Sequence, residues 1–237
     1  MAVPDEAAYW PLPVTPAPNP FADALTLLKR SVEAGARVVA IGPYTNLALF
    51  DRAQPGLLAR AAVYLMGGHV RPAPPGFQRW GAEQDFNLQY DVASARHLLK
   101  RLRPTLIPLE VTAQTALRRA HLPALRGAGS LGRLLAHQAE AFARDRTNQE
   151  PSGLTCAGLP YDTINFQHDP LACATAIGWD GVEIERLPIG LELRSDRLWM
   201  TVRPAGRPLR VVTRVDRERF EGEWLDAVTR ASSAGSG

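Results

Sequence analysis

The fold is decided by residues 37–50, RVVAIGPYTNLALF. The run at residues 37–42 is short, apolar and rich in β-branched side chains, which is typical of a buried parallel strand. Gly42-Pro43 then turns the chain, and a short helix is expected from Asn46 to Phe50. The stretch therefore predicts one strand-turn-helix step of an α/β protein.

The same succession recurs further along the chain. Residues 61–66, AAVYLM, predict a second strand that Gly67-Gly68 ends, and residues 91–102 predict a helix. Residues 104–108 are a third candidate strand. Strands that alternate with helices in this way predict an α/β fold with a mostly parallel sheet flanked by helices. In such sheets ligands bind at the carboxyl ends of the strands.

The flanking segments complete one predicted domain over residues 21–230. Helices are expected at residues 21–34, 131–144 and 216–230, and a small C-terminal antiparallel β element at residues 181–189 and 209–213. Prolines crowd residues 1–20, which predicts an extended proline-rich arm. Residues 231–237 are small and polar and predict a flexible tail.

Composition indicates an ordinary globular protein, since 46% of the 237 residues are hydrophobic. The net charge is only +3, and the 27 basic residues, all arginine except Lys29 and Lys100, are spread along the chain. This spread is expected of a solvated surface and not of a nucleic-acid-binding stripe. Apolar runs are too short to cross a bilayer, and no secretory signal is visible. Cys156 and Cys173 make no disulfide framework. We expect a cytoplasmic protein without nucleic-acid or membrane partners.

Four stretches carry residues suited to chemistry. They are IGPYTNLA at residues 41–48, LMGG at residues 65–68, DFN at residues 85–87 with Asp91, and PLEVT at residues 108–112 with HDPLA downstream at residues 168–172. In this order and at these spacings they resemble the inosine-uridine preferring nucleoside hydrolase family, over about residues 22–225. The combination carries the resemblance, because any single piece is a weak signal.

The resemblance implies a hydrolase of nucleoside catabolism and purine salvage. Its substrates would be purine or pyrimidine nucleosides, whose N-ribosidic bond it would cleave to ribose and free base. Such a site must activate a water, hold the ribose hydroxyls and help the base to leave. Relatives commonly form homodimers or homotetramers.

Three residues would serve the metal and the leaving base. The family uses a bound calcium ion, and the resemblance implies that Asp169 binds it through its carboxylate and Thr112 through its backbone oxygen. Calcium takes six to eight oxygen ligands, so these donor types suit it. His168 matches the residue that protonates the leaving base, a task for which histidine is suited near neutral pH.

Three further residues would hold the sugar. Asp85 and Asn87 match the positions that hydrogen-bond the ribose hydroxyls, and Met66 matches a residue beneath the sugar. The family usually has glutamate where Asp85 stands, and the shorter side chain shifts that contact.

Each of these residues also has a structural interpretation, which the sequence leaves open. His168-Asp169-Pro170 can cap a helix, since aspartate before proline commonly begins one. Asp85 and Asn87 can make local turns, and Met66 can belong to the core. Thr112 carries no signal of its own, because a backbone carbonyl leaves no mark in the sequence.

The chain departs from the family at its N-terminal end. Active relatives carry an aspartate cluster, DxDxxxDD, at the end of the first strand, where it binds calcium and supplies the base that deprotonates the water. The acidic residues before position 50 are Asp5, Glu6, Asp23 and Glu33, and they form no such cluster. We therefore expect an incomplete calcium site and a sheet that lacks its N-terminal strands and exposes an edge.

Three explanations of this departure stay open: a start codon assigned too late, which is favoured, a truncated relative, or one half of a split enzyme. The alternative function is a non-catalytic nucleoside- or ribose-binding remnant, or a subunit of a split enzyme. An unrelated nucleotide-binding domain is disfavoured because the chain has no GxxxxGK(S/T) loop.

Overall fold

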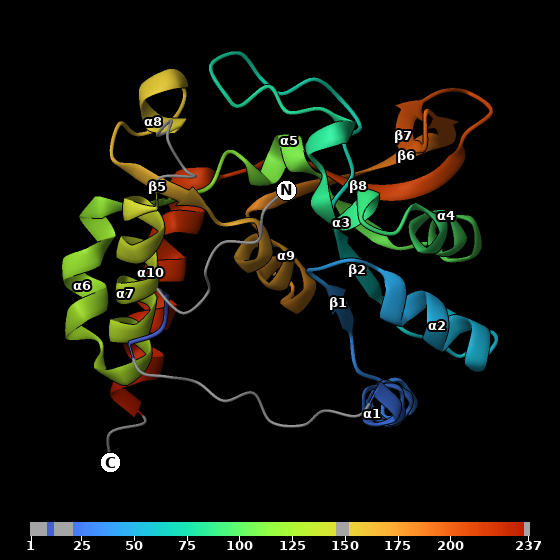
Figure 1. The fold of residues 1–237 in the computed structure, drawn as a ribbon, viewed down its shortest axis with the longest axis horizontal. Helices are drawn as coiled ribbons and strands as arrows, with labels where there is room; N and C mark the ends of the chain where they lie inside the picture. Colours follow the sequence, from blue (N-terminus) through green and yellow to red (C-terminus); the bar gives the residue numbers. More distant parts are fainter. Residues whose placement is uncertain (1–8, 12–20, 146–151, 235–237) are drawn as a thin grey trace.

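A six-stranded sheet forms the centre of the molecule in the computed structural model, which describes residues 9–11, 21–145 and 152–234 (Figure 1). The strand order is β1-β2-β3-β8-β6-β7. The first four strands of this order run parallel, and β6 is antiparallel to both of its neighbours. The strands are β1 (Val38–Ala40), β2 (Val63–Met66), β3 (Thr105–Ile107), β6 (Val182–Arg194), β7 (Arg197–Val202) and β8 (Arg207–Val215).

The predicted fold class is confirmed, because the apolar runs form parallel strands between helices. In the register of the sheet, Leu65 of β2 lies between Ala40 of β1 and Leu106 of β3, and both leucines are fully buried. The C-terminal strands are antiparallel, as expected, and they continue the main sheet because β8 pairs with β3 through Leu106 and Val211. A separate two-stranded sheet joins β4 (Ala116–Arg118) to β5 (Thr163–Phe166).

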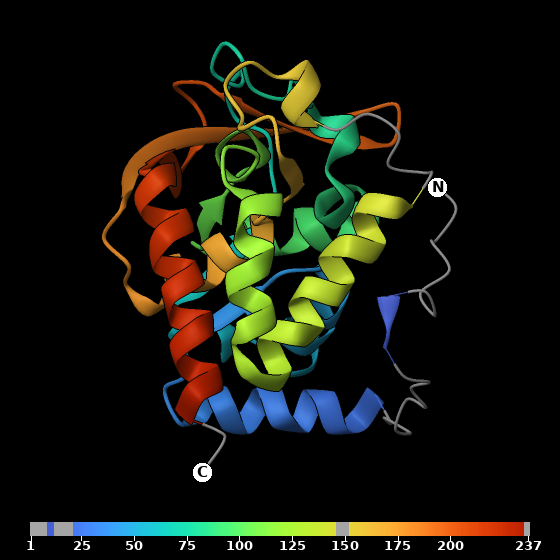
Figure 2. The ribbon, with the colours of Figure 1, turned by 90° about the vertical axis from the view of Figure 1, so that its left-hand side faces the viewer.

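Helices cover the sheet, and a group of three helices packs at one end of the molecule. The longer ones are α1 (Phe21–Glu33), α2 (Thr45–Ala53), α4 (Val92–Arg101), α6 (Leu122–Gly127), α7 (Gly129–Arg144), α9 (His168–Ile177) and α10 (Arg217–Ala234). The single turns are α3 (Phe86–Gln89), α5 (Leu109–Thr112), α8 (Ser152–Thr155), and the 3-10 segments Leu58–Arg60, Ala82–Gln84 and Arg119–His121. Figures 1 and 2 show α6, α7 and α10 packed side by side, away from β7.

The core lies between the sheet and the helices that follow its parallel strands. Phe50 of α2 and Leu98 of α4 are fully buried against the same cluster as Leu65 and Leu106. β1 lies at one end of the strand order, so it is an edge strand in the described part of the chain, and Ile41 beside it is 46% exposed. Among the described residues, no helix is both long and apolar enough to span a bilayer.

The predicted terminal segments fall largely outside the described residues. Of the proline-rich arm at residues 1–20, only residues 9–11 are described, and the Tyr9 hydroxyl donates to Asp145 at 2.8 Å. Residues 231–234 of the predicted tail are the end of α10, and residues 235–237 are not described.

Candidate active site

The predicted site residues follow the carboxyl ends of the parallel strands. Met66 is the last residue of β2, and α5, which contains Thr112, begins two residues after β3 ends. The helix α9, which begins at His168, packs against β1, β2 and α5 (Figure 1). Parallel strands end at one edge of a sheet, so segments far apart in the sequence are brought together there.

Met66 and Asn87 are in direct contact. The Met66 carbonyl oxygen accepts hydrogen bonds from Asn87 Nδ2 at 3.0 Å and from the Tyr44 hydroxyl at 2.8 Å. Asn87 Nδ2 also lies 3.1 Å from Met66 Sδ. Met66 and Asn87 are both buried, and Tyr44 is fully buried. The ends of β1 and β2 are thus joined through one carbonyl group, and two of the predicted sugar-binding residues share it.

Asp85 accepts backbone hydrogen bonds from two different segments of the chain. One carboxylate oxygen accepts from the Gly68 N–H, and the other accepts from the Leu88 N–H at 3.0 Å, which caps α3. Asp85 is only 1% exposed, and burial raises the pKa of its carboxyl, although the backbone hydrogen bonds oppose the rise. Its observed contacts are structural, as the turn interpretation expects.

The turn that Asp85 holds requires glycine at both positions. Gly67 and Gly68 have φ values of +138° and +98°, which other residues rarely adopt. A Cβ atom on Gly67 would lie 2.6 Å from the Tyr44 hydroxyl. The close approach of Tyr44 therefore depends on the missing side chain.

His168 lies beside two aromatic rings and one hydroxyl group. Its Nδ1 is 2.6 Å from Thr112 Oγ1, across 56 positions of sequence. Its ring centroid is 5.8 Å from that of Trp80 and 5.5 Å from that of Phe166, and these two rings meet edge-on at 5.0 Å. Burial lowers the pKa of His168 to about 4, so the imidazole is neutral at pH 7.

Asp169 lies in the first turn of α9, where negative charge is favourable. It is not the N-cap, because α9 begins at His168 and the cap is Gln167, whose side chain makes no capping bond. Asp169 is half-buried, and burial raises the pKa of its carboxyl. Nearby, the Thr112 carbonyl accepts from the Thr115 N–H at 3.1 Å and from Thr115 Oγ1 at 2.9 Å.

Sequence reasoning missed three residues of this region. Trp80 and Phe166 frame His168, and the available signals were an aromatic residue in the proline- and glycine-rich loop and another two positions before the histidine. Glu110 is the third residue. One of its oxygens accepts from the Val70 and Arg71 N–H groups, both at 3.1 Å. The signal for it was an acidic residue directly after a buried strand, in the PLEVT stretch.

Glu110 is only 7% exposed, and its second oxygen, Oε2, is buried with no hydrogen-bond partner among the described residues. Burial, helped by the nearby Asp85, raises the pKa of Glu110 to about 7, although three backbone hydrogen bonds oppose the rise. It is therefore a carboxyl group that titrates near neutral pH at this edge of the sheet. In the described part of the chain, no group of three or more His, Cys, Asp or Glu side chains could hold a metal ion.

Comparison with known proteins identifies the family. The sequence profile of the inosine-uridine preferring nucleoside hydrolases matches residues 6–222, which is most of the chain. The chain belongs to this family. Nucleoside hydrolases act on N-glycosyl compounds, and the family is generally metal-dependent. A search of curated protein sequences found no significant match.

Solved nucleoside hydrolase structures share the fold. A purine-preferring ribonucleoside hydrolase from Gardnerella vaginalis superposes with a TM-score of 0.71 at 22% identity, covering 90% of this chain and 67% of its own. The plant nucleoside hydrolase PpNRh1 gives 0.73 at 16% identity, covering 95% and 73%. An inosine-uridine preferring nucleoside hydrolase from Bacillus anthracis gives 0.63 at 18%, covering 91% and 66%. The chain thus spans about two thirds to three quarters of these nucleoside hydrolases.

Proposed function

We propose that this chain hydrolyses the N-ribosidic bond of purine or pyrimidine nucleosides to ribose and free base. The observation that carries the proposal is His168, which Thr112 holds beside two aromatic rings at the carboxyl edge of the sheet. In the reaction the bond from C1′ to the base nitrogen breaks and the water oxygen bonds to C1′. One water proton stays on the oxygen that is now bonded to C1′. The second water proton is released, and the base nitrogen takes up one proton, so the number of protons is unchanged.

His168 is the proposed donor to the leaving base. The 2.6 Å contact fits a Thr112 hydroxyl that donates to Nδ1, which leaves the proton of the neutral ring on Nε2. That N–H can hydrogen-bond the departing nitrogen. Full proton transfer proceeds from the imidazolium, which forms by taking up the proton that the attacking water loses and returns to the neutral ring as the base is protonated. The base gains negative charge as the bond breaks, and a negative charge nearby favours the protonated imidazole. Thr112 is thus a positioning residue that fixes which nitrogen faces the substrate.

Met66 and Asn87 are proposed to line the ribose site. Their shared contact at the end of β2 fixes both side chains relative to each other. Asp85 is proposed to act through Gly68, because both of its oxygens already accept backbone hydrogen bonds. Trp80 and Phe166 contribute ring surface beside His168.

Calcium was expected from the family resemblance, with Asp169 and Thr112 as ligands. The residues present do not fit a complete calcium site: Asp169 supplies one carboxylate, and the Thr112 carbonyl already accepts two hydrogen bonds from Thr115. Calcium affinity follows the number of charged ligands. We therefore assign no catalytic step to a metal, and we propose that calcium binds this chain only weakly through Asp169.

This incomplete donor set favours the alternative function, a nucleoside- or ribose-binding protein without catalysis, or a subunit of a split enzyme. A binding site needs shape and hydrogen bonds to a neutral sugar, which Met66 and Asn87 can help to provide. Hydrolysis also needs a group that activates the water. Homodimer or homotetramer formation and a cytoplasmic location remain predictions.

The decisive experiment measures ribose release and nucleoside binding on the same protein. The chain is incubated with inosine or uridine, with calcium or with a chelator, and reducing sugar is measured. We expect ribose release that His168→Ala abolishes. The control is His97→Gln, a substitution on α4 away from the candidate site. The new amide can still donate a hydrogen bond to Asp51 of α2. Calorimetric binding of nucleoside without ribose release would establish the alternative. If the chain neither binds nucleoside nor releases ribose, both functions are refuted.

A further inference from the structure

A cluster of cationic side chains surrounds the C-terminal end of α4. Two hollows, of about 250 and 330 Å³, meet at Arg207. Their lining includes Lys100, Arg101, Arg103, Arg203 and Arg207, and none of the described residues that line them is acidic. We call these five side chains the Arg207 surface. It lies beside Val63 and Arg103, where β2 and β3 begin, whereas the candidate active site lies where they end.

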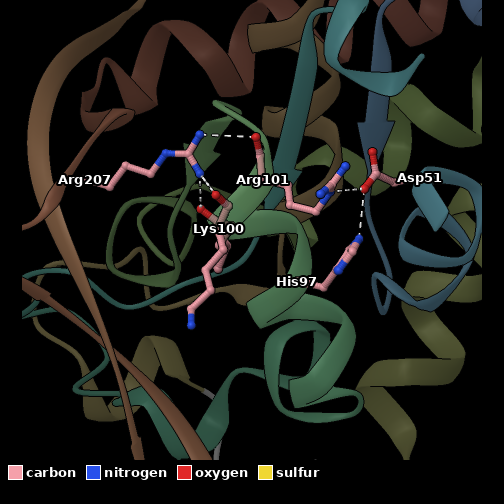
Figure 3. Close-up of polar contacts among 6 residues, drawn as sticks. Asp51, His97, Lys100, Arg101 and Arg207 are labelled. Carbon is pink, nitrogen blue, oxygen red and sulfur yellow. Dashed lines mark hydrogen bonds and ion pairs between the residues drawn. The ribbon is translucent and has the colours of Figure 1, made fainter. Parts of the chain in front are cut away.

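Hydrogen bonds to the protein hold two guanidinium groups of this surface, those of Arg207 and Arg101 (Figure 3). The Arg207 guanidinium donates to the carbonyl oxygens of Leu99 at 3.1 Å, Arg101 at 3.2 Å and Lys100. Arg101 donates through Nε to Asp51 at 2.7 Å. Rigid groups lose little conformational entropy when they bind a ligand, so the surface is preorganised.

The positive charge of this surface is only partly neutralised by the protein, because Asp51 ion-pairs with Arg101 and Glu192 interacts electrostatically with Arg203. Asp51 is 1% exposed, and its carboxylate contacts Arg101 and His97, whose Nε2 is 2.9 Å away (Figure 3). The exposed side chains of Lys100 and Arg103 make no hydrogen bond or ion pair with the other described residues. Burial and the neighbouring Arg103 charge both lower the pKa of Arg207. Like charges held close together favour an anionic ligand.

We propose that the Arg207 surface binds an acidic segment of a partner polypeptide. The cations are distributed over two hollows on either side of Arg207, which suits several carboxylates spaced along one chain. A nucleic acid fits less well, because single strands bind largely by stacking bases on aromatic rings, and no aromatic residue lines the described hollows. This surface is independent of the proposed nucleoside chemistry.

The test uses a fluorescein-labelled peptide of alternating glutamate and serine, with a glutamine-serine peptide as the neutral control. Binding is followed by fluorescence anisotropy. The variant Lys100→Gln/Arg103→Gln should weaken glutamate-peptide binding about tenfold, since each exposed ion pair contributes modestly. The matched control Arg30→Gln/Arg133→Gln removes the same charge from α1 and α7 and should stay within about twofold of the parent chain. Circular dichroism checks that both variants fold.

Three results would overturn the proposal. Equal weakening by both double variants would mean that only the net charge matters. Absence of glutamate-peptide binding at low salt would mean that the surface has no affinity for acidic segments. Tighter binding of a single-stranded oligothymidylate of equal charge would assign the surface to nucleic acid. The expected binding weakens between about 50 and about 300 mM salt, because exposed charge pairs are screened.

Discussion

The substitution Glu110→Gln tests the buried carboxyl beside the candidate site. Its pKa is about 7 in the fold against an ordinary value of 4.5. Below pH 4.5 the group is protonated in both the folded and the unfolded chain and costs nothing. As the pH rises to about 7 only the unfolded chain ionises freely, so the free energy of unfolding should fall by roughly 3 kcal/mol through this group. Above pH 7 the loss is complete.

The amide of Glu110→Gln cannot ionise, so this pH dependence should disappear. The amide oxygen can still accept from the Val70 and Arg71 N–H groups, while the NH2 group takes the place of the unpartnered Oε2 at a cost of about 1–3 kcal/mol. The variant should therefore be less stable than the parent at pH 4.5, and it should gain roughly 3 kcal/mol relative to it by pH 7.5.

Urea denaturation followed by circular dichroism from pH 4.5 to 8 measures this difference. All other titrating groups cancel between the two proteins, provided their surroundings are unchanged. The matched control is Glu183→Gln, which makes the same substitution at an exposed side chain. A constant difference between Glu110→Gln and the parent chain across this range would refute the inference that Glu110 titrates near neutral pH.

Four further outcomes test the site. Tyr44→Phe removes the hydroxyl that donates to the Met66 carbonyl and should lower stability by about 1 kcal/mol in thermal denaturation while raising the KM for nucleoside. Gly67→Ala forces a side chain onto a backbone with φ +138° and against Tyr44, so it should cost more than about 2 kcal/mol, and unchanged stability would contradict the geometry. His168 should titrate at about pH 4 by NMR, and Thr112→Val should lower nucleoside turnover with little change in KM.

The sequence predicts the elements whose patterns are long or strongly apolar. The expected helix at residues 91–102 agrees with α4, because its apolar residues recur at helical spacing and Asp91 caps it. The short strands β4 and β5 were not predicted, since segments of three and four residues show no readable alternation. β7 was also not predicted, although it pairs with β6 over its whole length.

The sequence indicated which residues belong to the candidate site, but it did not indicate which of their side chains are in contact. Family resemblance pointed to His168 and Thr112, yet nothing in the sequence indicates that their side chains meet across 56 positions. The structural roles of Asp85 and the high pKa of Glu110 arise from burial, which depends on the assembled fold. Likewise, basic residues that are spread along the chain gather around Arg207 only in three dimensions.

Burial dominates the electrostatics of the candidate site, and this bears on what the site can do. It is the largest cause of the pKa shifts of Asp85, Glu110, Asp169 and His168, and in each it favours the neutral form. A site in which charge is disfavoured suits the binding of an uncharged sugar. Hydrolysis makes the opposite demand, because positive charge develops on the ribose and needs carboxylates nearby. Nucleoside binding should therefore change little between pH 6 and 8, whereas ribose release should rise as Glu110, whose pKa is about 7, ionises. A release rate that is flat over this range would mean that the Glu110 carboxylate does not assist the reaction.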